Sequence, residues 1–384
     1  MKYQTPIPIV AAKRSPIGRF GGGLKSLSAA AIGHQVVSGA LTAEMIDATQ
    51  LTIAGQVLQA GCGMNPSRQL ALASGISQDS PAYTINMVCG SGLKAVTAIA
   101  DTIALGEIGC GLAVGMESMT QAPFYSTQQR WGSKFGDVTL RDAVQMDGLT
   151  DPTLAIPMGE TAERIAAHLD ISRDEQDAFA VESQQRTCAG FESEIIPVVS
   201  RDGTISTDEH PRPGTTCEKL GALKPAFRPD GTVTAGNSSG INDGAAAIFL
   251  CNEASAATHG WKPLARVVGH SVIGCDPGMM GLGPVPAIRR LLAEIGWSID
   301  DVDCFEINEA FAAQAIACIR LLDLPAYRVN PRGGAIALGH PIGCSGTRIL
   351  VTLLHNLIRN DQKCGVAALC VGGGMGIAIA VERG

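Results

Sequence analysis

Short apolar runs alternate with stretches of helical periodicity over the first 118 residues of the chain. The apolar runs have the length of buried strands, and they occupy 7–12, 51–54, 83–88 and 112–114. Between them, apolar side chains recur on one helical face in 28–45, 66–74 and 93–105. Strands that alternate with helices in this way predict a parallel or mixed sheet covered by helices.

The stretch from 119 to 238 has more charge, more proline and fewer strand-like runs. Ser172, followed three residues later by Glu175, forms a capping-box sequence for a helix that runs to Gln185. We interpret this stretch as an inserted, more exposed domain. The alternation then returns, with strand candidates at 245–250, 264–268, 302–307, 366–371 and 377–381 and helix candidates at 284–295, 310–322 and 349–358.

The two halves that flank the insertion have similar patterns. A glycine-containing segment precedes a helix at 90–92 in the first half and at 343–346 in the second. In each half a strand and further glycines follow about 20 residues later. We therefore expect an internal duplication of one α/β unit, with a ligand cleft at the carboxyl ends of strands.

Composition narrows the class of protein. Hydrophobic residues make up 46% and charged residues 17% of the 384 positions, so a large core is buried or an oligomer hides further surface. The net charge of −7 argues against a nucleic-acid or membrane partner. The first twelve residues have no signal-peptide pattern and no apolar stretch reaches a membrane span, so we expect a cytoplasmic location. The 12 cysteines include no Cys-x-x-Cys pair, so we expect free thiols and no zinc site.

Cys89 is the first candidate for chemistry. It lies in Asn-Met-Val-Cys-Gly-Ser-Gly, at an expected strand-to-helix junction. Small residues there let a substrate approach the backbone, and the helix N-terminus favours the thiolate. The alternative is a buried cysteine that acts as a small hydrophobe.

His340 lies between glycines, in Leu-Gly-His-Pro-Ile-Gly, before an expected helix. It is placed to face a cleft and to act as a base for a thiol. The alternative is a turn histidine that bonds to the backbone. No P-loop, Gly-x-Ser-x-Gly or His-Glu-x-x-His motif is present.

Cys370 ends another expected strand and enters the run Gly372–Gly374, whose amides are suited to bind an anion. Only eight residues follow Gly376, so this run does not begin a dinucleotide-binding helix. Asn308, after the expected strand at 302–307, fits either a helix cap or a catalytic amide.

These segments, in this order, resemble the thiolase family and, within it, the acetyl-CoA acetyltransferases. The matching segments are 12–23, 55–68, 86–92, 115–119, 234–247, 308–311, 333–346 and 370–376. The resemblance implies an α/β fold with two duplicated βαβαβαββ core domains in an α/β/α/β/α sandwich, plus an inserted loop domain. The implied domains are 1–118 with 239–261, the loop domain 119–238 that binds coenzyme A, and 262–384. A homotetramer, built as a dimer of dimers, is also implied.

The resemblance also implies the reaction and its residues. Cys89 takes the acetyl group of one acetyl-CoA, and His340 activates its thiol. Cys370 removes a proton from the methyl group of a second acetyl-CoA, and the carbanion attacks the acetyl-enzyme. The products are acetoacetyl-CoA and CoA, and the reaction is reversible. Coenzyme A is substrate and product, with no tightly bound cofactor.

The same resemblance assigns the groups around the reaction. Two oxyanions need donors. One set is His340 with a water held by Asn308, and the other is the amides of Cys89 and Gly372. The implied substrate-binding positions are Arg212, Phe227, Ala235, Ser239, Leu149, Met158, Met280, Ala310 and Phe311.

Two positions depart from the family pattern. Pro157 stands where many biosynthetic members have His beside the acyl pocket, which leaves the chain-length range open. Arg332 stands where Asn is frequent, and we expect an altered contact beside the loop of His340.

Four other functions fit part of the pattern. A degradative 3-ketoacyl-CoA thiolase shares the same catalytic residues. A carrier-protein ketoacyl synthase uses His or Asn in place of Cys370. A non-catalytic acyl-CoA or lipid-binding relative would not need the complete set of reactive groups. A cysteine hydrolase with Cys89 and His340 leaves the second thiol unexplained.

Overall fold

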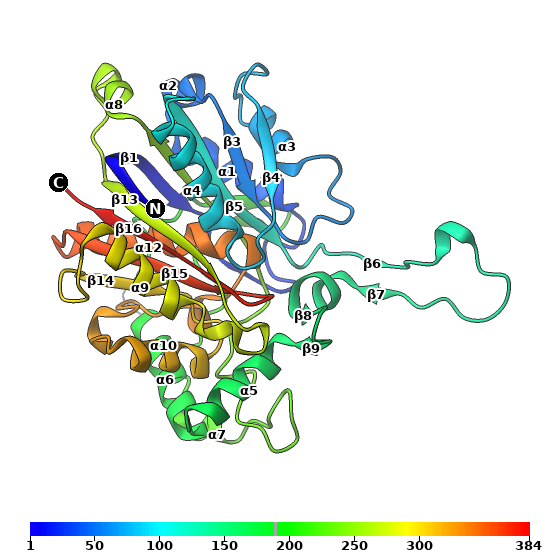
Figure 1. The fold of residues 1–384 in the computed structure, drawn as a ribbon. Coiled ribbons are helices and arrows are strands. Elements are labelled where there is room, and N and C mark those ends of the chain that lie inside the picture. Colours follow the sequence, from blue (N-terminus) through cyan, green and yellow to red (C-terminus); the bar gives the residue numbers. More distant parts are fainter. Residues whose placement is uncertain (188–189) are drawn as a thin grey trace.

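The computed structural model describes residues 1–187 and 190–384, and its centre is one twisted mixed sheet. The strand order is β14-β15-β16-β13-β1-β12-β5-β3-β4, and the short β2 pairs with β12. All of these strands except β2 and β12 are labelled in Figure 1. The strands are β1 Lys2–Arg14, β2 Gly18–Arg19, β3 Thr52–Gly55, β4 Ala82–Ile85, β5 Cys110–Ser118, β12 Asn242–Cys251, β13 Ala265–Gly274, β14 Cys304–Ile307, β15 Cys364–Val371 and β16 Met375–Glu382.

The two halves of this sheet and the helices that cover them form five layers. The helices are α1 Ala29–Ala40, α2 Ala43–Ala48, α3 Pro66–Ala73, α4 Ser91–Ala104, α8 Glu253–His259, α9 Pro284–Ile295, α10 Ala312–Leu322, the short α11 Ala335–Leu338 and α12 Ile342–Arg359. One buried cluster joins α4 and α12 to the inner faces of both sheet halves. A second joins α1 and α3 to the outer face of the first half, and a third joins α9 and α10 to that of the second. The α/β/α/β/α sandwich is therefore confirmed.

The expected duplication is visible in the strand order. From the central antiparallel pair of β1 and β13, the first half continues β12, β5, β3 and the second β16, β15, β14. In both halves the β3–β5 and β14–β15 pairs are parallel and the inner pairs antiparallel. The halves differ at the third strand. In the order of the chain, the third strand of the first half is β4. The corresponding segment of the second half forms only a bridge between Phe305 and Val329. It does not extend into a strand, because a 3-10 turn precedes Val329 and Asn330, which follows, has a φ of 44°.

Several boundaries differ from the sequence prediction. The helix predicted over 28–45 is two helices, since Thr42 caps α2. The strand predicted over 83–88 ends at Ile85. The segment 343–346 lies inside α12 and does not precede it. Glycine there allows close helix packing, because a Cβ on Gly346 would lie 2.3 Å from the nitrogen of Leu93 in α4.

The stretch 119–238 forms helices and short hairpins beside the sheet. Its elements are β6 Phe124–Tyr125, a 3-10 turn Gln129–Trp131, β7 Arg141–Asp142, a π-helical turn Val144–Leu149, β8 Thr150–Asp151, β9 Ile156–Pro157, α5 Met158–His168, α6 Arg173–Arg186, β10 Val198–Ser200, β11 Gly203–Ile205 and α7 Cys217–Gly221. The capping box of Ser172 and Glu175 is confirmed at the start of α6. The segment between β6 and β7 extends away from the body as an arm (Figure 1).

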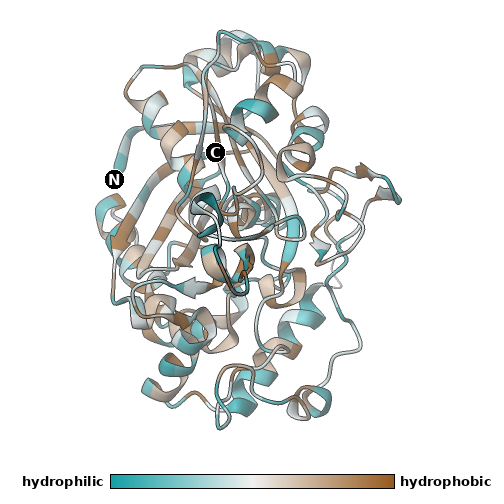
Figure 2. Ribbon diagram, turned by 90° about the vertical axis from the view of Figure 1, so that its right-hand side faces the viewer, coloured by the Kyte–Doolittle hydropathy of each residue, from teal (hydrophilic) through white to brown (hydrophobic). Residues whose placement is uncertain are grey.

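Hydropathy follows these layers. Figure 2 shows brown and white strands inside the molecule, with teal segments on outer helices and loops. Among the described residues, none of the helices combines the length and apolarity needed to span a membrane.

Candidate active site

Cys89 lies in a tight turn between β4 and α4. Val88 has a φ of 46°, an uncommon conformation for a β-branched residue, and such strain is often found at functional sites. Ser91 holds the turn, since its Oγ accepts from the nitrogen of Met87 at 2.8 Å and donates to the oxygen of Val88 at 2.7 Å. The turn therefore fixes the direction of the Cys89 side chain.

The thiol of Cys89 is surrounded by apolar groups. It packs against the cluster of Val57, Leu58 and Ile342. Burial raises the pKa of Cys89 to about 11, while the backbone N–H of Gly372 acts in the opposite direction. Desolvation outweighs the effect of the backbone N–H groups on the pKa, so the thiol of Cys89 is neutral in the resting protein, and the predicted help from the helix N-terminus stays a prediction. The thiol needs a base.

Cys370 is the second thiol at this place. It is the penultimate residue of β15, and Gly373 and Gly374 make the turn to β16 with φ values of 83° and 85°. Its side chain is buried with Met280, Ala310 and Phe311. Burial raises the pKa of Cys370 well above its usual range, and the neighbouring thiol of Cys89 adds to this. The thiols of Cys89 and Cys370 are therefore neighbours, and both are neutral.

His340 is held on both sides before α12 begins. Its backbone nitrogen donates to Oδ1 of Asn242 at 3.0 Å. Its Nδ1 lies 2.5 Å from Oγ of Ser345, whose hydroxyl donates to the oxygen of Pro341. Because a hydroxyl has one proton, Nδ1 must carry the ring proton and Nε2 must carry the lone pair. Nε2 is buried without a hydrogen-bond partner in the described chain, and burial lowers the pKa of His340 to about 3.

Asn308 follows β14 and does not cap a helix, because the N-cap of α10 is Phe311. Its backbone nitrogen donates to the oxygen of Ala368 at 3.0 Å. Both polar atoms of its side chain are buried without a partner among the described residues. Such an amide is suited to hold a water or a substrate oxygen.

A cavity of about 610 Å³ reaches His340, whereas Cys89, Cys370, Asn308 and Gly372 are not among its lining residues. Its wall contains His340 and most of the predicted substrate positions, namely Leu149, Met158, Arg212, Phe227, Ala235, Ser239 and Phe311. Met280 and Ala310 do not line it, and are buried in one cluster with Phe311 and Cys370. Pro157 is also in the wall. The fold thus brings His340 and most of the predicted substrate positions to one cavity, and both thiols pack against residues of its wall, while their roles stay predictions.

The sequence reasoning missed further residues of this site. Arg19, Gln145 and His210 also line the cavity. Asn242 and Ser345, which hold His340, lie within two matching segments, but nothing in the pattern assigned them a role.

Arg332 makes a different contact from the one predicted. Its guanidinium is buried and donates to Asn356, to Glu194 at 2.9 Å and to the oxygen of Gly190 at 2.9 Å. It therefore joins α12 to the loop stretch, and its side chain bonds to none of the residues that hold His340.

Comparison with models of known protein families shows which family this chain belongs to. The model of the N-terminal domain of thiolases matches residues 7–254, and that of the C-terminal domain matches 261–383. The chain belongs to the thiolase family. The prediction of that family is therefore confirmed.

Relatives and solved structures are similar to this thiolase over its whole length. An acetyl-CoA acetyltransferase of Chromobacterium violaceum is 47% identical over 98% of this chain and 99% of its own. A cytosolic acetyl-CoA acetyltransferase of Mus musculus is 47% identical over 99% and 98%. The structure of human mitochondrial 3-ketoacyl-CoA thiolase with CoA has a TM-score of 0.97 at 42% identity, covering 100% and 99%. That of the Bacillus anthracis acetyl-CoA acetyltransferase has a TM-score of 0.96 at 42% identity, covering 100% of both chains.

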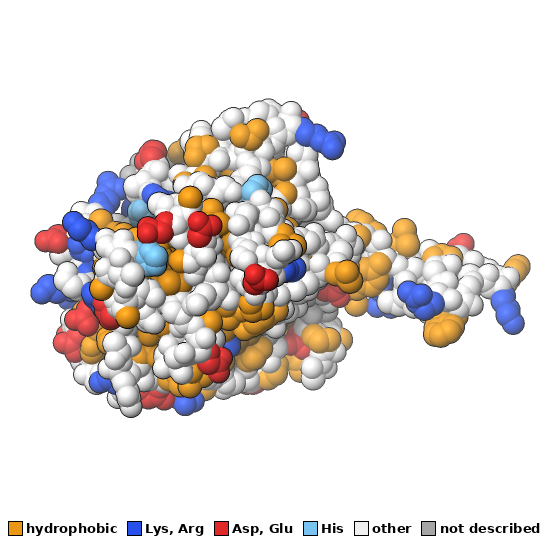
Figure 3. Space-filling model, turned by 90° about the horizontal axis from the view of Figure 1, so that it is seen from above, with side chains coloured by type: hydrophobic (Ala, Val, Ile, Leu, Met, Phe, Trp, Pro, Cys, Tyr) orange, Lys and Arg blue, Asp and Glu red, His pale blue; other side chains and the backbone are white. Residues whose placement is uncertain are grey.

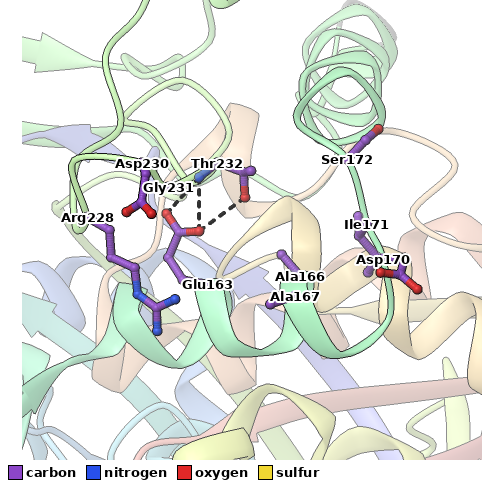
Figure 4. Close-up of a pocket in the computed structure, with 10 residues that line it drawn as sticks. All are labelled: Glu163, Ala166, Ala167, Asp170, Ile171, Ser172, Arg228, Asp230, Gly231 and Thr232. Carbon is purple, nitrogen blue, oxygen red and sulfur yellow. Dashed lines mark hydrogen bonds between the residues drawn. The ribbon is translucent and has the colours of Figure 1, made fainter.

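A second hollow of about 330 Å³ lies between α5 and the start of α6 in this thiolase (Figure 4). Three carboxylates line it, those of Glu163, Asp170 and Asp230. The carboxylate of Glu163 already has hydrogen-bond partners, because it accepts from the backbone N–H groups of Thr232 and Val233. No group of three or more metal-binding side chains is present in the described ranges. This hollow does not have the features of a catalytic site.

We expect His340 to make the thiolase less stable in acid. Its pKa is about 3 in the folded chain and 6.5 in the unfolded chain, so between these values only the unfolded state binds the proton. Stability therefore falls as the pH is lowered from 6.5 towards 3. Between about pH 7.5 and about pH 5, wild type should lose about 2 kcal/mol more unfolding free energy than His340→Asn.

Urea unfolding at fixed protein concentration measures this difference. His168→Asn, which changes an exposed histidine at the end of α5, is the control and should follow wild type. Parallel curves for wild type and His340→Asn would contradict a buried neutral imidazole.

Proposed function

We propose that this thiolase is an acetyl-CoA C-acetyltransferase that forms acetoacetyl-CoA and CoA from two acetyl-CoA, and the reverse, through an acetyl-Cys89 intermediate. One observation carries the proposal. The thiols of Cys89 and Cys370 are neighbours, both are neutral, and the amide of Gly372 faces the thiol of Cys89. Both thiols pack against residues of a cavity wall that also contains His340, whose Nε2 has no hydrogen-bond partner among the described residues. Relatives with this name at 46–48% identity support the choice of substrate.

In the first half-reaction, Nε2 of His340 takes the thiol proton of Cys89. The thiolate attacks the thioester carbon of acetyl-CoA, and the amides of Cys89 and Gly372 stabilise the oxyanion. The carbon–sulfur bond to CoA then breaks, and CoA leaves with the proton. A thioester on Cys89 keeps the acetyl group activated for the next step.

In the second half-reaction, the thiol of Cys370 gives its proton to Nε2 of His340, and the resulting thiolate takes a methyl proton from a second acetyl-CoA. The enolate oxygen is stabilised by the Nε2–H of His340 and a water on Asn308. The carbanion attacks acetyl-Cys89, a carbon–carbon bond forms, and the carbon–sulfur bond to Cys89 breaks. The Cys89 thiolate takes the proton back from Nε2 of His340, and acetoacetyl-CoA is released. Burial of Cys370 raises its thiol pKa and so makes its thiolate a strong base.

A degradative 3-ketoacyl-CoA thiolase is the second candidate, and Pro157 favours it. This ring forms part of the cavity wall next to Met158. The high structural similarity to human mitochondrial 3-ketoacyl-CoA thiolase supports the same alternative.

Thiolysis separates these functions. Purified protein is mixed with CoA and either acetoacetyl-CoA or 3-ketohexadecanoyl-CoA, and loss of the 3-ketoacyl absorbance is followed. We expect turnover of acetoacetyl-CoA only. Turnover of both substrates would make the protein a broad degradative thiolase, and turnover of neither would favour a binding protein or a hydrolase.

We also propose that residues 119–238 act as the coenzyme A-binding loop domain between core domains 1–118 with 239–261 and 262–384. Arg212 and Phe227 of this stretch line the cavity, which supports that role. No tightly bound cofactor, nucleic acid or membrane enters the proposed reaction. A cytoplasmic location is proposed because bacterial relatives and a cytosolic mouse relative are similar over the full length.

The arm between β6 and β7 supports a homotetramer. Trp131 is 88% exposed and Phe135 is 100% exposed on it. Figure 3 shows the arm, with hydrophobic side chains along it, projecting from the body. A projecting segment with exposed aromatic rings is typical of a subunit interface.

The double variant Trp131→Asp and Phe135→Asp should lower the mass in solution from tetramer to dimer, because each charge must be desolvated in the interface. Light scattering after size-exclusion chromatography measures the mass. Tyr327→Asp, which changes another exposed aromatic residue far along the chain, is the control. An unchanged tetramer in the double variant would remove the arm from the interface.

A further inference from the structure

The carboxylate of Glu117 lies behind the site and is not used by the reaction above. Glu117 is in β5 and is fully buried. Its Oε2 accepts from the nitrogen of Gly343 at 2.8 Å and of Val57 at 3.0 Å, and its Oε1 accepts from that of Leu58 at 3.2 Å. All three donors are backbone groups, so the carboxylate joins two separate chain segments.

Both segments carry parts of the site. Val57 and Leu58 follow β3 and pack against Cys89 in one cluster together with Ile342. Gly343 is the second residue of α12 and lies three residues after His340. Glycine is needed at this position, because a Cβ there would lie 2.7 Å from the oxygen of Met116 and 2.9 Å from Oε2 of Glu117. The geometry thus places one carboxylate between the support of the nucleophile and the support of the base.

We propose that Glu117 is a positioning residue, which fixes the N-terminus of α12, and with it His340, relative to the apolar support of Cys89. The catalytic part of this inference rests on the proposed function. Glu117 acts through backbone N–H groups and does not line the cavity.

The surroundings of Glu117 give a second, electrostatic consequence. The ionisable groups that face it are Asp243 of β12, Cys344 of α12, Cys89 and Cys62. Burial raises the pKa of Glu117 to about 7, so it is charged above neutral pH. Its negative charge then raises the pKa of the Cys89 thiol. Removing the charge should make the thiolate of Cys89 form at lower pH, a change that loss of packing alone does not produce.

The test is Glu117→Gln, which removes the charge and one of the two acceptor oxygens. We expect kcat for acetoacetyl-CoA thiolysis to fall about 10- to 100-fold with KM nearly unchanged, because orientation and not binding is lost. We also expect the pH midpoint of Cys89 alkylation by iodoacetamide, followed by peptide mass spectrometry, to move down. The control is Asp303→Asn. Asp303 also accepts two backbone N–H groups, those of Lys363 and Cys364, but at the far end of β15.

A kcat within about twofold of wild type and an unmoved alkylation midpoint would overturn the proposal. If Glu117→Gln does not fold, Glu117→Asp replaces it. That variant keeps the charge and shortens the reach, so a lower kcat with an unmoved midpoint supports the proposal and a wild-type kcat overturns it. If wild type does not cleave acetoacetyl-CoA, the proposed function fails. The alkylation midpoint of Glu117→Gln alone then decides, with a fall in support and no change against.

Discussion

Cys89→Ala should lose both acetylation and turnover. Without the thiol, no thioester forms at the turn before α4, and removal of a nucleophile costs about 10⁴-fold or more in kcat. Wild type incubated with acetyl-CoA should gain the mass of one acetyl group on the peptide that contains Cys89. The variant should gain none, and thiolysis of acetoacetyl-CoA should stop.

The matched control is Cys364→Ser, at the start of β15 and at the other end of that strand from Cys370. It should be acetylated and active like wild type. Acetylation of the Cys89→Ala variant at Cys370 or at any other residue would contradict the assignment of the two thiols.

Cys370→Ala should separate the two half-reactions. Cys89 and His340 are intact in this variant, so acetyl-CoA should still acetylate Cys89. Condensation should fail by about 10³-fold, because no base remains to remove the methyl proton of the second acetyl-CoA. Intact-mass measurement follows the acetylation, and formation of acetoacetyl-CoA follows the condensation.

Release of the acetyl group from the Cys370→Ala variant by added CoA provides an internal control. This reversal needs only the first half-reaction and should keep its wild-type rate. Normal condensation by the variant would remove Cys370 as the base, and loss of acetylation would assign it to the first half-reaction instead.

Much of the fold follows from local patterns. The helix Pro284–Ile295 begins and ends where its apolar spacing predicts. The capping box at Ser172 is formed as predicted. Prediction failed where packing decided a boundary. The start of α12 contains Gly343 and Gly346, and glycine disfavours a helix locally. The helix forms there because Gly346 lets it approach α4 and Gly343 lets it approach β5.

Some residues of the site could be predicted and others could not, because the role of the latter depends on packing. Cys89, His340 and Cys370 occur in short glycine-rich motifs, so their residue types and family resemblance single them out. Glu117 was part of a matching segment without a role, because its partners are backbone groups 60 and 226 positions away. Only the tertiary structure places such groups in one bond network.

By itself, the sequence determined the alternation of strands and helices, the two similar halves, the family and the residue types that can react. These features are local or repeated, and each is specified by neighbours along the chain. The tertiary structure decided the protonation of the reactive groups. Apolar burial from both halves keeps the thiols of Cys89 and Cys370 and the ring of His340 neutral. Desolvation depends on everything that packs around a group, and no segment of sequence contains that information alone.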